Sequence, residues 1–400
     1  MSKNPTIRRV GLAAVALTVL VGFGVLGHRS AFSAKKDYDY YLPSTPENMY
    51  FGWFPRDAPP ALTVPSGSIV RIDTISQRGV GGGGLDPVAY LGTFGVAPEE
   101  VLQDVINAYN NFPASHRAAR GGGGHYLTGP IYVDGAEPGD TLEVRIMKVE
   151  PRVNYGINAQ SSGGALPGYL TSSTTRLIRT KGNVALFKDG VEIPLKPFQG
   201  TMGVAAADSY VSPNTGAAAV GIVSSQPPGP YGGNMDLNDL GEGTSIFYPV
   251  FRTGGQFFTG DPHDVQGNGE VSGNALEMSN TLTAQFIVHK GGGLTVPRAE
   301  TPTHFIMMGI DVDHDVAYTA ALAEVLAFLQ SQKGMSLADA RAFASLAVDF
   351  NIAESVDLTN LVMGRIPKRM FTEDFSVKDF WHKPLNKFSE GQRNGLDGFH

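Results

Sequence analysis

One short glycine-rich stretch concentrates the side chains best suited to chemistry. Residues 257–270 read FFTGDPHDVQGNGE and carry Asp261, His263, Gln266 and Glu270 among glycines. Asp261 and His263 are two apart across a proline, so an extended strand would direct both side chains to the same side. Neutral imidazole and carboxylate oxygen are ligands that suit zinc. The pattern predicts a metal held by Asp261 and His263, with Glu270 as a general base.

Hydrolysis of an unactivated amide makes demands that such a set could meet. The carbonyl must be polarised, a water made nucleophilic and the departing amine protonated. The same residues could instead be ordinary turn residues that bond to the local backbone, and spacing alone leaves both interpretations open. The sequence holds no H-E-x-x-H motif, and the acids do not follow the order of a calcium-binding loop.

Further candidates lie elsewhere in the chain. Asn234 and Asp236 alternate in YGGNMDLNDL (231–240), so both could face one site. His125 follows a run of glycines, and Asp73 stands at the end of a predicted strand. Each of these residues alone could have a purely structural role; as site residues, Asp73, His125 and Asp236 would help hold the metal, and Asn234 and Gln266 would orient the substrate by hydrogen bonds.

Composition excludes several classes of protein. The 400-residue chain has no cysteine, so a thiol nucleophile, a thiolate metal ligand and a disulfide are all impossible. Its net charge is −7, which disfavours nucleic acid as a partner. The 50 glycines and 26 prolines predict many turns and short strands.

The N-terminus has the pattern of an export signal. A basic segment with Arg8 and Arg9 precedes the apolar run 11–27, and small residues stand at the cleavage positions Ala31 and Ser33. The arginine pair resembles a twin-arginine signal. We expect residues 1–33 to be a signal peptide, or a membrane anchor if they stay uncleaved, and we expect the mature protein to face the periplasm.

The remaining elements indicate a β-rich chain with late helices. We expect an extended aromatic arm over 34–60, one domain over 61–371 and a C-terminal tail over 372–400. The patterns that predict elements are strand runs at 62–74 and 281–288, hairpins at 131–151 and 183–195, and helices at 98–111, 314–334 and 336–350. The glycine clusters 79–84 and 120–125 are interpreted as flexible turns, because neither matches a phosphate loop.

Several uncommon strings, in order along the chain, resemble the acetamidase/formamidase family. The strings are TGPIYVDGAEPGDTLEV (128–144), LKPFQGTMGVAA (195–206), GGNMDL (232–237), GDPHDVQGNGEVSGNALE (260–277) and MGIDVDHDVAYTAA (308–321). The resemblance implies an α+β, β-rich fold of barrel- and sandwich-like parts, often oligomeric. It also implies cleavage of the C–N bond of small linear amides to acid and ammonia, with a divalent metal, zinc in preference to calcium. The matching positions are His125, Asn234, Asp236, Asp261, His263, Gln266 and Glu270.

Two positions depart from the pattern expected of this family. Gln77 stands where a histidine is expected, and Asn268 stands where an aspartate is common. If either position supplies a ligand or a proton acceptor, turnover of acetamide or formamide would suffer. The alternative is a non-catalytic exported binding or assembly protein on the same scaffold, in which the polar stretch holds a structural cation or a ligand.

Overall fold

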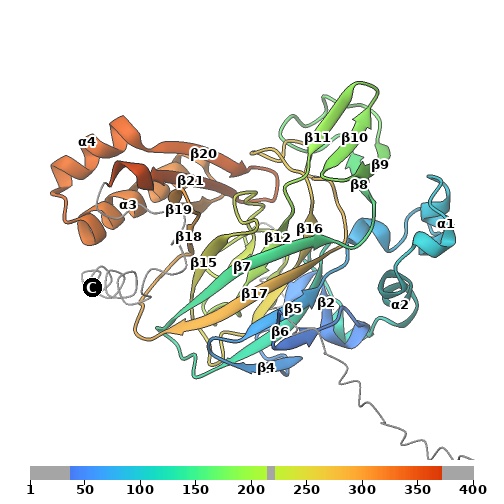
Figure 1. Cartoon of the computed structure of the whole chain (residues 1–400), viewed down its shortest axis with the longest axis horizontal. Coiled ribbons are helices and arrows are strands. Elements are labelled where there is room, and N and C mark those ends of the chain that lie inside the picture. Colours follow the sequence, from blue (N-terminus) through green and yellow to red (C-terminus); the bar gives the residue numbers. More distant parts are fainter. Residues whose placement is uncertain (1–36, 214–220, 372–400) are drawn as a thin grey trace, which may run out of the picture. The chain divides into compact units, whose positions relative to one another are not determined.

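The computed structural model describes residues 37–213 and 221–371, which form four β-sheets and a small number of helices (Figure 1). The largest sheet has nine strands, in the order β1 (Tyr40–Leu42), β5 (Ile69–Asp73), β17 (Asn280–His289), β7 (Thr141–Pro151), β15 (Thr244–Pro249), β18 (Arg298–Glu300), β19 (His304–Asp311), β21 (Asn360–Pro367) and β20 (Asp349–Glu354). The second has six strands, in the order β14 (Gly232–Asn234), β12 (Phe198–Gly203), β16 (Phe257–His263), β6 (Tyr126–Asp134) and β2 (Met49–Phe51), with β4 (Leu62–Pro65) paired to β6.

The two large sheets share one hydrophobic core. Val144 of β7 and Leu282 of β17 belong to the same buried cluster as Met202 of β12 and Phe258 of β16. Strands β7 and β17 are buried along most of their length, although apolar residues alternate with polar or charged residues such as Glu143 and Arg145 of β7. The sheets therefore pack face to face, which is the sandwich-like β-rich fold expected from the sequence.

The segment 131–151 is not a hairpin, contrary to the prediction. β6 and β7 flank the GAEPGD turn as expected, but β6 pairs with β16, β2 and β4, whereas β7 pairs with β15 and β17. The turn thus joins the two sheets. The physical reason is burial. The first six residues of each strand are all buried, so each strand must be covered on both faces. A single two-stranded hairpin would not provide that cover.

Two helices cover the end of the nine-stranded sheet, as predicted. α3 (His314–Lys333) begins at the N-cap Asp313 and ends at Gly334, whose left-handed φ of 63° closes the helix. α4 (Leu337–Ala347) is capped by Ser336, whose Oγ accepts from the Asp339 amide at 3.1 Å. Side chains of both helices pack against β19 and β21. The second helix ends earlier than its predicted limit, since residues 349 and 350 already belong to β20.

The predicted helix over 98–111 is divided. Residues Pro98–Glu100 form a short 3-10 helix, η3, and the α-helix α2 starts only at Gln103 and runs to Asn111. Glu100 accepts a hydrogen bond from the Ala97 amide at 2.9 Å, which caps the start of η3, and the extended backbone of Val101 and Leu102 separates η3 from α2. The remaining short helices are α1 (Pro87–Gly92), η1 (Pro46–Asn48), η2 (Gln77–Gly79), η4 (Ala114–His116) and η6 (Lys368–Met370).

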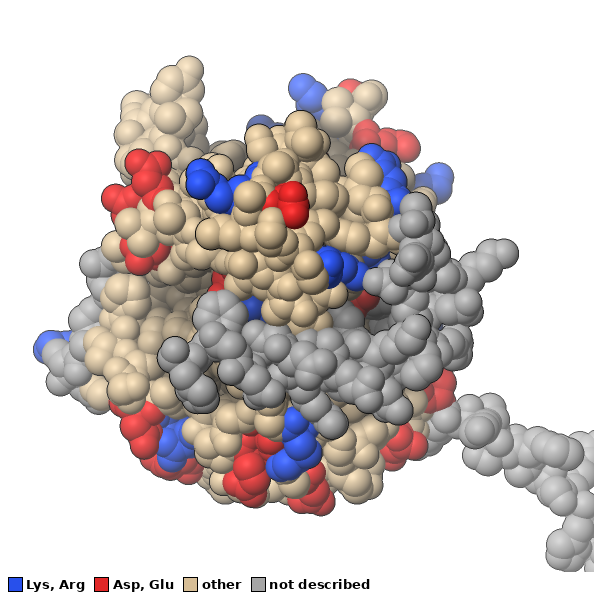
Figure 2. Space-filling view, turned by 90° about the vertical axis from the view of Figure 1, so that its left-hand side faces the viewer, with Lys and Arg blue, Asp and Glu red and all other residues tan. Residues whose placement is uncertain are grey.

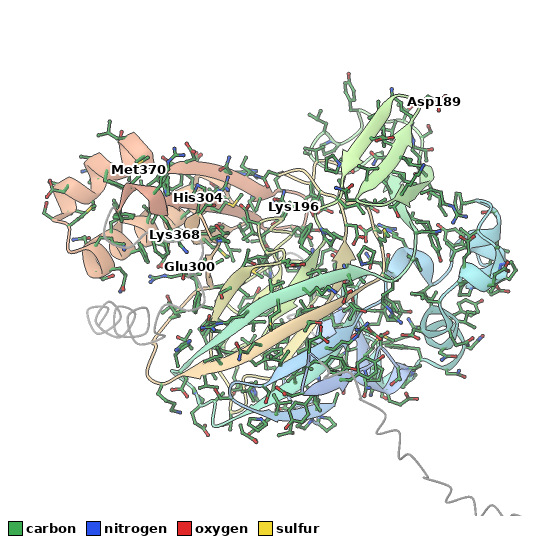
Figure 3. The ribbon with its side chains drawn as sticks, viewed as in Figure 1. Asp189, Lys196, Glu300, His304, Lys368 and Met370 are labelled. Atoms are coloured by element: carbon green, nitrogen blue, oxygen red, sulfur yellow. The ribbon has the colours of Figure 1, made fainter. Side chains whose placement is uncertain are left out.

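The other predicted strands form, and two small sheets complete the fold. One has the order β11 (Val191–Pro194), β10 (Val184–Lys188), β9 (Thr174–Lys181) and β8 (Tyr155–Gln160), and the other pairs β13 (Val223–Ser224) with β3 (Trp53–Phe54). The predicted hairpin over 183–195 is β10 and β11, with Asp189 at its tip (Figure 3). Within the expected arm, β1, β2 and β3 each pair with a strand from outside it.

The described surface is mixed in charge. On the face in Figure 2, acidic and basic side chains lie in small separate groups, without a continuous basic area. Within residues 37–213 and 221–371, none of the helices combines the length and apolarity needed to cross a membrane. The predicted signal segment 1–33 and tail 372–400 lie outside the described residues.

Candidate active site

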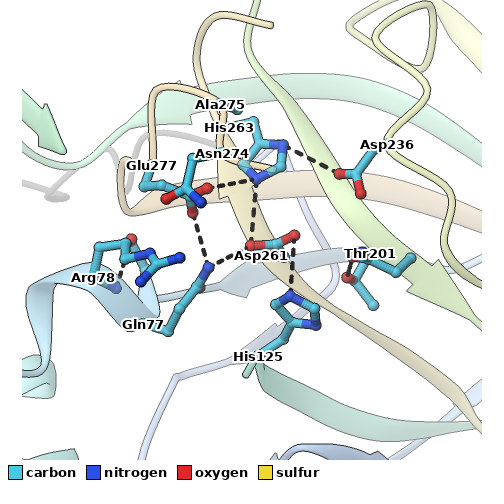
Figure 4. Close-up of polar contacts among 12 residues, drawn as sticks. Gln77, Arg78, His125, Thr201, Asp236, Asp261, His263, Asn274, Ala275 and Glu277 are labelled. Carbon is cyan, nitrogen blue, oxygen red and sulfur yellow. Dashed lines mark hydrogen bonds and ion pairs between the residues drawn. The ribbon is translucent and has the colours of Figure 1, made fainter. Parts of the chain in front are cut away.

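Strand β16 brings Asp261 and His263 to one face of the six-stranded sheet. Both side chains are nearly fully buried, and His263 Nε2 lies 3.3 Å from Asp261 Oδ1 (Figure 4). The neighbouring strand β12 has Gly200 beside them. A Cβ at Gly200 would lie 2.4 Å from Asp236 Oδ1, 2.7 Å from His263 Cε1 and 2.9 Å from Asp261 Oδ2. The missing side chain of Gly200 therefore provides the space in which these polar groups meet.

Further carboxylates reach the same place from loops. Asp236 follows β14, and its Oδ1 lies 3.3 Å from His263 Nδ1. Glu277 bridges to β16 at His263, and its Oε1 lies 3.4 Å from His263 Nε2. Glu270 and Asp357 line the same cavity of about 140 Å³. One imidazole is thus surrounded by a cluster of acidic oxygens that come from well-separated parts of the chain.

Hydrogen bonds fix the imidazole of His263 in one orientation. Its Nδ1 lies 3.0 Å from Gln266 Oε1, and Gln266 Nε2 donates to the backbone carbonyl of Asp236 at 2.7 Å. With two acceptors beside Nδ1, the proton is assigned to that nitrogen. Nε2 is buried without a hydrogen-bond partner among the described residues and lies beside the carboxylates of Asp261 and Glu277. This is the arrangement in which histidine binds a metal through Nε2.

The role predicted for Gln266 needs correction. Both polar groups of its side chain are already bonded within the protein, and Gln266 is not among the residues that line the cavity. It positions His263 and is not placed to orient an amide. Asn234, by contrast, lines the cavity, and its Oδ1 accepts from Thr201 Oγ at 2.5 Å. That bond leaves the amide hydrogens of Asn234 as donors.

Asp73 does not join the cluster, contrary to expectation. Its Oδ2 accepts from the Tyr41 hydroxyl at 2.5 Å, its Oδ1 accepts from Thr281 at 2.6 Å, and Arg152 lies 3.7 Å away. These partners use both carboxylate oxygens, so Asp73 is not free to bind a metal. His125 does line the cavity: its Nδ1 is 2.9 Å from the Ser225 carbonyl, and its Nε2 is 3.8 Å from Asp261 Oδ2.

Two acidic residues were missed by the sequence analysis. Glu277 closes the string 260–277, but nothing in its spacing from Asp261 separates it from an ordinary strand residue. Asp357 lies far along the chain, between β20 and β21. Gln77 was noted only as a departure, yet its Nε2 donates to Asp261 Oδ1 at 2.8 Å and to Glu277 Oε2 at 2.9 Å. Asn268, the second departure, is exposed and bonds to Asn238, away from the cavity.

Backbone strain gathers at the same place. Five non-glycine residues within the described ranges have positive φ, and three of them are Asp236 (43°), Asp261 (52°) and Glu270 (39°). Such conformations cost about 1–3 kcal/mol each and persist only where the surroundings impose them. This backbone strain lowers the stability of the fold, and the strained conformations direct these three carboxylates into the cavity.

Burial and mutual repulsion alter the protonation of the cluster. Burial, followed by the charge of Glu270, raises the pKa of Asp236 well above its ordinary value. Burial and then Asp357 raise the pKa of Glu270 in the same way. Burial alone would also raise the pKa of Asp261, but the charges of His263 and His125 lower it below its usual range. The pKa of His263 is raised well above normal, because Asp261 and Glu277 outweigh the effect of its burial.

The residues fit a divalent cation. Ligand atoms of Asp236, Asp261 and His263 all lie within 4.8 Å of one another, and two overlapping groups extend the set through Glu270, Glu277 and Asp357. Asp236 Oδ1 and His263 Nε2 are buried without hydrogen-bond partners in the described structure. Oxygen and imidazole nitrogen together suit zinc, whereas calcium takes oxygen ligands only.

The raised pKa values predict how stability depends on pH when no cation is bound. In the window from about pH 5 to pH 8, Asp236, Glu270 and His263 hold more protons in the folded state than in the unfolded state, so stability falls as pH rises. We expect chelator-treated protein to lose on the order of a few kcal/mol across this window. Urea unfolding at several pH values measures the loss, and saturating zinc should reduce it, because the cation replaces the protons. Stability that stays constant or increases over this window would contradict the prediction.

Comparison with known proteins supports the relationship suggested by the sequence. The model of the acetamidase/formamidase family matches residues 115–215 and 210–373. A formamidase from Methylophilus methylotrophus is 27% identical over 305 residues, or 59% of this chain and 74% of that protein. An acetamidase from Mycolicibacterium smegmatis is 28% identical over 274 residues, or 51% of this chain and 66% of that protein. In a Schizosaccharomyces pombe relative the match spans only about half of that protein, 52% of its length.

Solved structures agree on the fold. The crystal structure of an acetamidase from Bacillus halodurans has a TM-score of 0.66 at 24% identity, covering 83% of this chain and 99% of that one. An acetamidase from Yersinia enterocolitica has a TM-score of 0.67 at 24% identity, covering 85% and 95% of the two chains. At this identity the structures establish a common fold, and the family model establishes descent. The chain belongs to the acetamidase/formamidase family.

Proposed function

We propose that this protein is an exported, metal-assisted amidohydrolase that cleaves the C–N bond of small linear amides to a carboxylic acid and ammonia. The observation that carries the proposal is the cluster of His263 with Asp236, Asp261 and Glu270, whose three carboxylates line one small cavity. Family membership supports the same reaction, since the relatives include proteins named formamidase and acetamidase. A cavity of about 140 Å³ suits a group of a few heavy atoms.

Asp236, Asp261 and His263 would hold the cation, with zinc favoured. When bound, a divalent cation supplies a Lewis acid for the carbonyl oxygen of the amide. Gln266 holds the imidazole so that Nε2 faces the carboxylates, and Gly200 leaves the space that the ligands need. His125 adds a second imidazole at the wall of the cavity, beside Asp261.

Two residues that line the cavity are assigned the remaining roles, substrate binding and proton transfer. Asn234 is anchored through its carbonyl by Thr201, so its amide hydrogens are free to donate to the substrate oxygen, where negative charge develops. Glu270 lies at the cavity, and burial together with Asp357 raises its pKa, so it holds a proton at higher pH than an ordinary glutamate does. We assign to Glu270 the transfer of a proton from the attacking water to the departing nitrogen, which then leaves as ammonia.

The variant Glu270→Gln tests this assignment. Glutamine keeps the size of the side chain but cannot exchange the proton, so we expect kcat for ammonia release from formamide or acetamide to fall by about 100-fold. The matched control is Glu192→Gln, an exposed residue of β11, which should leave the rate unchanged. Full activity in Glu270→Gln would remove Glu270 from the mechanism. No ammonia from any short amide, even after metal loading, would overturn the proposed function.

Gln77 is the observation that favours the alternative, a non-catalytic cation-binding protein on the same scaffold. Its amide already donates to Asp261 and Glu277, two of the acidic groups at the cavity. Elemental analysis separates the two functions. Calcium in the purified protein, together with no turnover of any amide, would favour the alternative.

Export is part of the proposal because of the basic and apolar pattern in residues 1–33. Sequencing the N-terminus of the protein recovered from the periplasm checks it, with cleavage expected near Ser33. The resemblance also implies a homo-oligomer, which the mass in solution measures directly.

A further inference from the structure

A second and larger cavity adjoins the candidate active site. This outer cavity has a volume of about 490 Å³, and its wall shares Gln77, Arg78 and Gly124 with the wall of the smaller cavity. Volumes of about 300–1,000 Å³ are typical of sites that bind whole small molecules. Formamide or acetamide would fill only the inner cavity, so the outer one offers room for a longer substrate.

The walls of the outer cavity suit a hydrocarbon chain. Phe51, Tyr90 and Tyr109 supply aromatic surface, and Leu85 adds an aliphatic side chain. Leu85 and Tyr109 are 41% and 44% exposed, so they mark the side that opens to solvent. Glycines of the cluster 79–84 form part of the wall, and a Cβ at Gly82 would lie 2.6 Å from the Tyr90 ring. The glycine cluster is therefore more than a flexible turn, because Gly82 lets the Tyr90 ring pack directly against the backbone of the wall.

The charge of the outer cavity is positive, in contrast to the chain as a whole. Arg78 and Arg117 line it, and none of its lining residues is acidic. Arg117 is held over the rings of Phe51 at 5.1 Å and Phe112 at 4.7 Å. Nε of Arg78 is buried and has no hydrogen-bond partner among the described residues. Neither guanidinium forms an ion pair within the described structure; Arg117 bonds to Tyr126, which also lines the cavity, and both guanidiniums face no carboxylate there.

We propose that the outer cavity receives the acyl part of the substrate and that this part is a short hydrocarbon chain ending in a carboxylate. The preferred substrate would then be a monoamide of a dicarboxylic acid. Its amide would lie in the inner cavity, its methylenes would pass the aromatic wall, and its carboxylate would bind Arg117, which lines the outer cavity only, by charge-assisted hydrogen bonds. This inference rests on the proposed amide hydrolysis and specifies its substrate class.

Turnover of matched amides tests the inference with the full, metal-loaded protein. Adipamate and glutaramate are compared with hexanamide and valeramide, which have the same chain lengths without the carboxylate, and with acetamide. We expect kcat/KM for the anionic amides to exceed that of their neutral counterparts by about tenfold or more, as one charge-assisted contact provides. The measurement is ammonia release.

Two variants identify the cavity as the cause. Arg117→Met keeps an unbranched side chain between Phe51 and Phe112 but removes the charge, so the preference for adipamate over hexanamide should disappear while acetamide turnover stays unchanged. Leu85→Trp fills the outer cavity and should raise KM for both long amides without affecting acetamide. Thermal unfolding of both variants confirms that they remain folded.

The outcomes separate this inference from the proposed function. Turnover of acetamide with equal rates for adipamate and hexanamide would overturn the carboxylate-bearing substrate and leave the amidohydrolase in place. A preference for adipamate that survives in Arg117→Met would overturn the assignment of the outer cavity. Failure on every amide, acetamide included, would overturn the proposed function and this inference with it.

Discussion

Gly200→Ala is expected to abolish amide hydrolysis although it adds a single methyl group. The new Cβ would lie 2.4 Å from Asp236 Oδ1, 2.7 Å from His263 Cε1 and 2.9 Å from Asp261 Oδ2. All three neighbours are short, fully buried side chains, so none of them has room to retreat. A displacement of about 1 Å at a catalytic group costs about 100-fold, and here three groups are displaced together, so we expect kcat/KM to fall by at least about 1,000-fold.

The same substitution should also weaken metal binding, which isothermal titration with zinc measures independently of turnover. Gly200 does not have a left-handed φ, so alanine adds no backbone strain and the effect comes from the methyl group alone. The matched control is Gly92→Ala in α1, where an added Cβ would meet nothing within 4 Å. If Gly200→Ala bound zinc and hydrolysed acetamide as well as Gly92→Ala does, the space beside Gly200 would not be the active site.

Local patterns predicted the part of the site that one strand supplies. Asp261 and His263 are two apart in an extended strand, and the alternation of strand side chains is enough to bring them to the same side. Asp236 and Glu270 were also named, but their positive φ values are imposed by surrounding structure and leave no mark in a sequence. Asp357 reaches the cavity from a loop between the last two strands, and only the pairing of distant strands places it there.

Asp73 illustrates the limit of reasoning from strand ends. The sequence correctly placed it at the end of a strand, β5, but this strand belongs to the nine-stranded sheet, whereas β16 belongs to the six-stranded one. Tyr41, in the segment expected as an extended arm, then takes one of its oxygens. Similarly, the residues 131–151 form two strands as predicted, and only their burial on both faces reveals that they belong to different sheets.

His263→Ala is expected to have the largest effect of any single substitution, and it should affect activity and stability separately. His263 provides the only imidazole in the three groups of possible metal ligands among the described residues. Removing it takes away the nitrogen ligand and the positive charge that lowers the pKa of Asp261. We expect kcat/KM to fall by about 10,000-fold or more, comparable to the loss of a residue from a catalytic unit. The control variant His304→Ala, at a half-buried residue of β19 outside the cavity, should retain full activity.

The stability of His263→Ala should depend on pH in a way that identifies the cause. Without the imidazole, Asp236, Asp261 and Glu277 are left as buried carboxylates with no histidine between them, and loss of one partner from a buried charge cluster costs about 3–5 kcal/mol. Because the pKa of His263 is raised on folding, the stabilisation that its imidazole provides is fully present below the unfolded pKa and is lost as pH rises toward the folded pKa, so the penalty should be largest near about pH 5 and smaller near about pH 8. Urea unfolding at both pH values measures the difference. A loss of stability that is the same at both would assign His263 a packing role and remove it from the charged centre of the site.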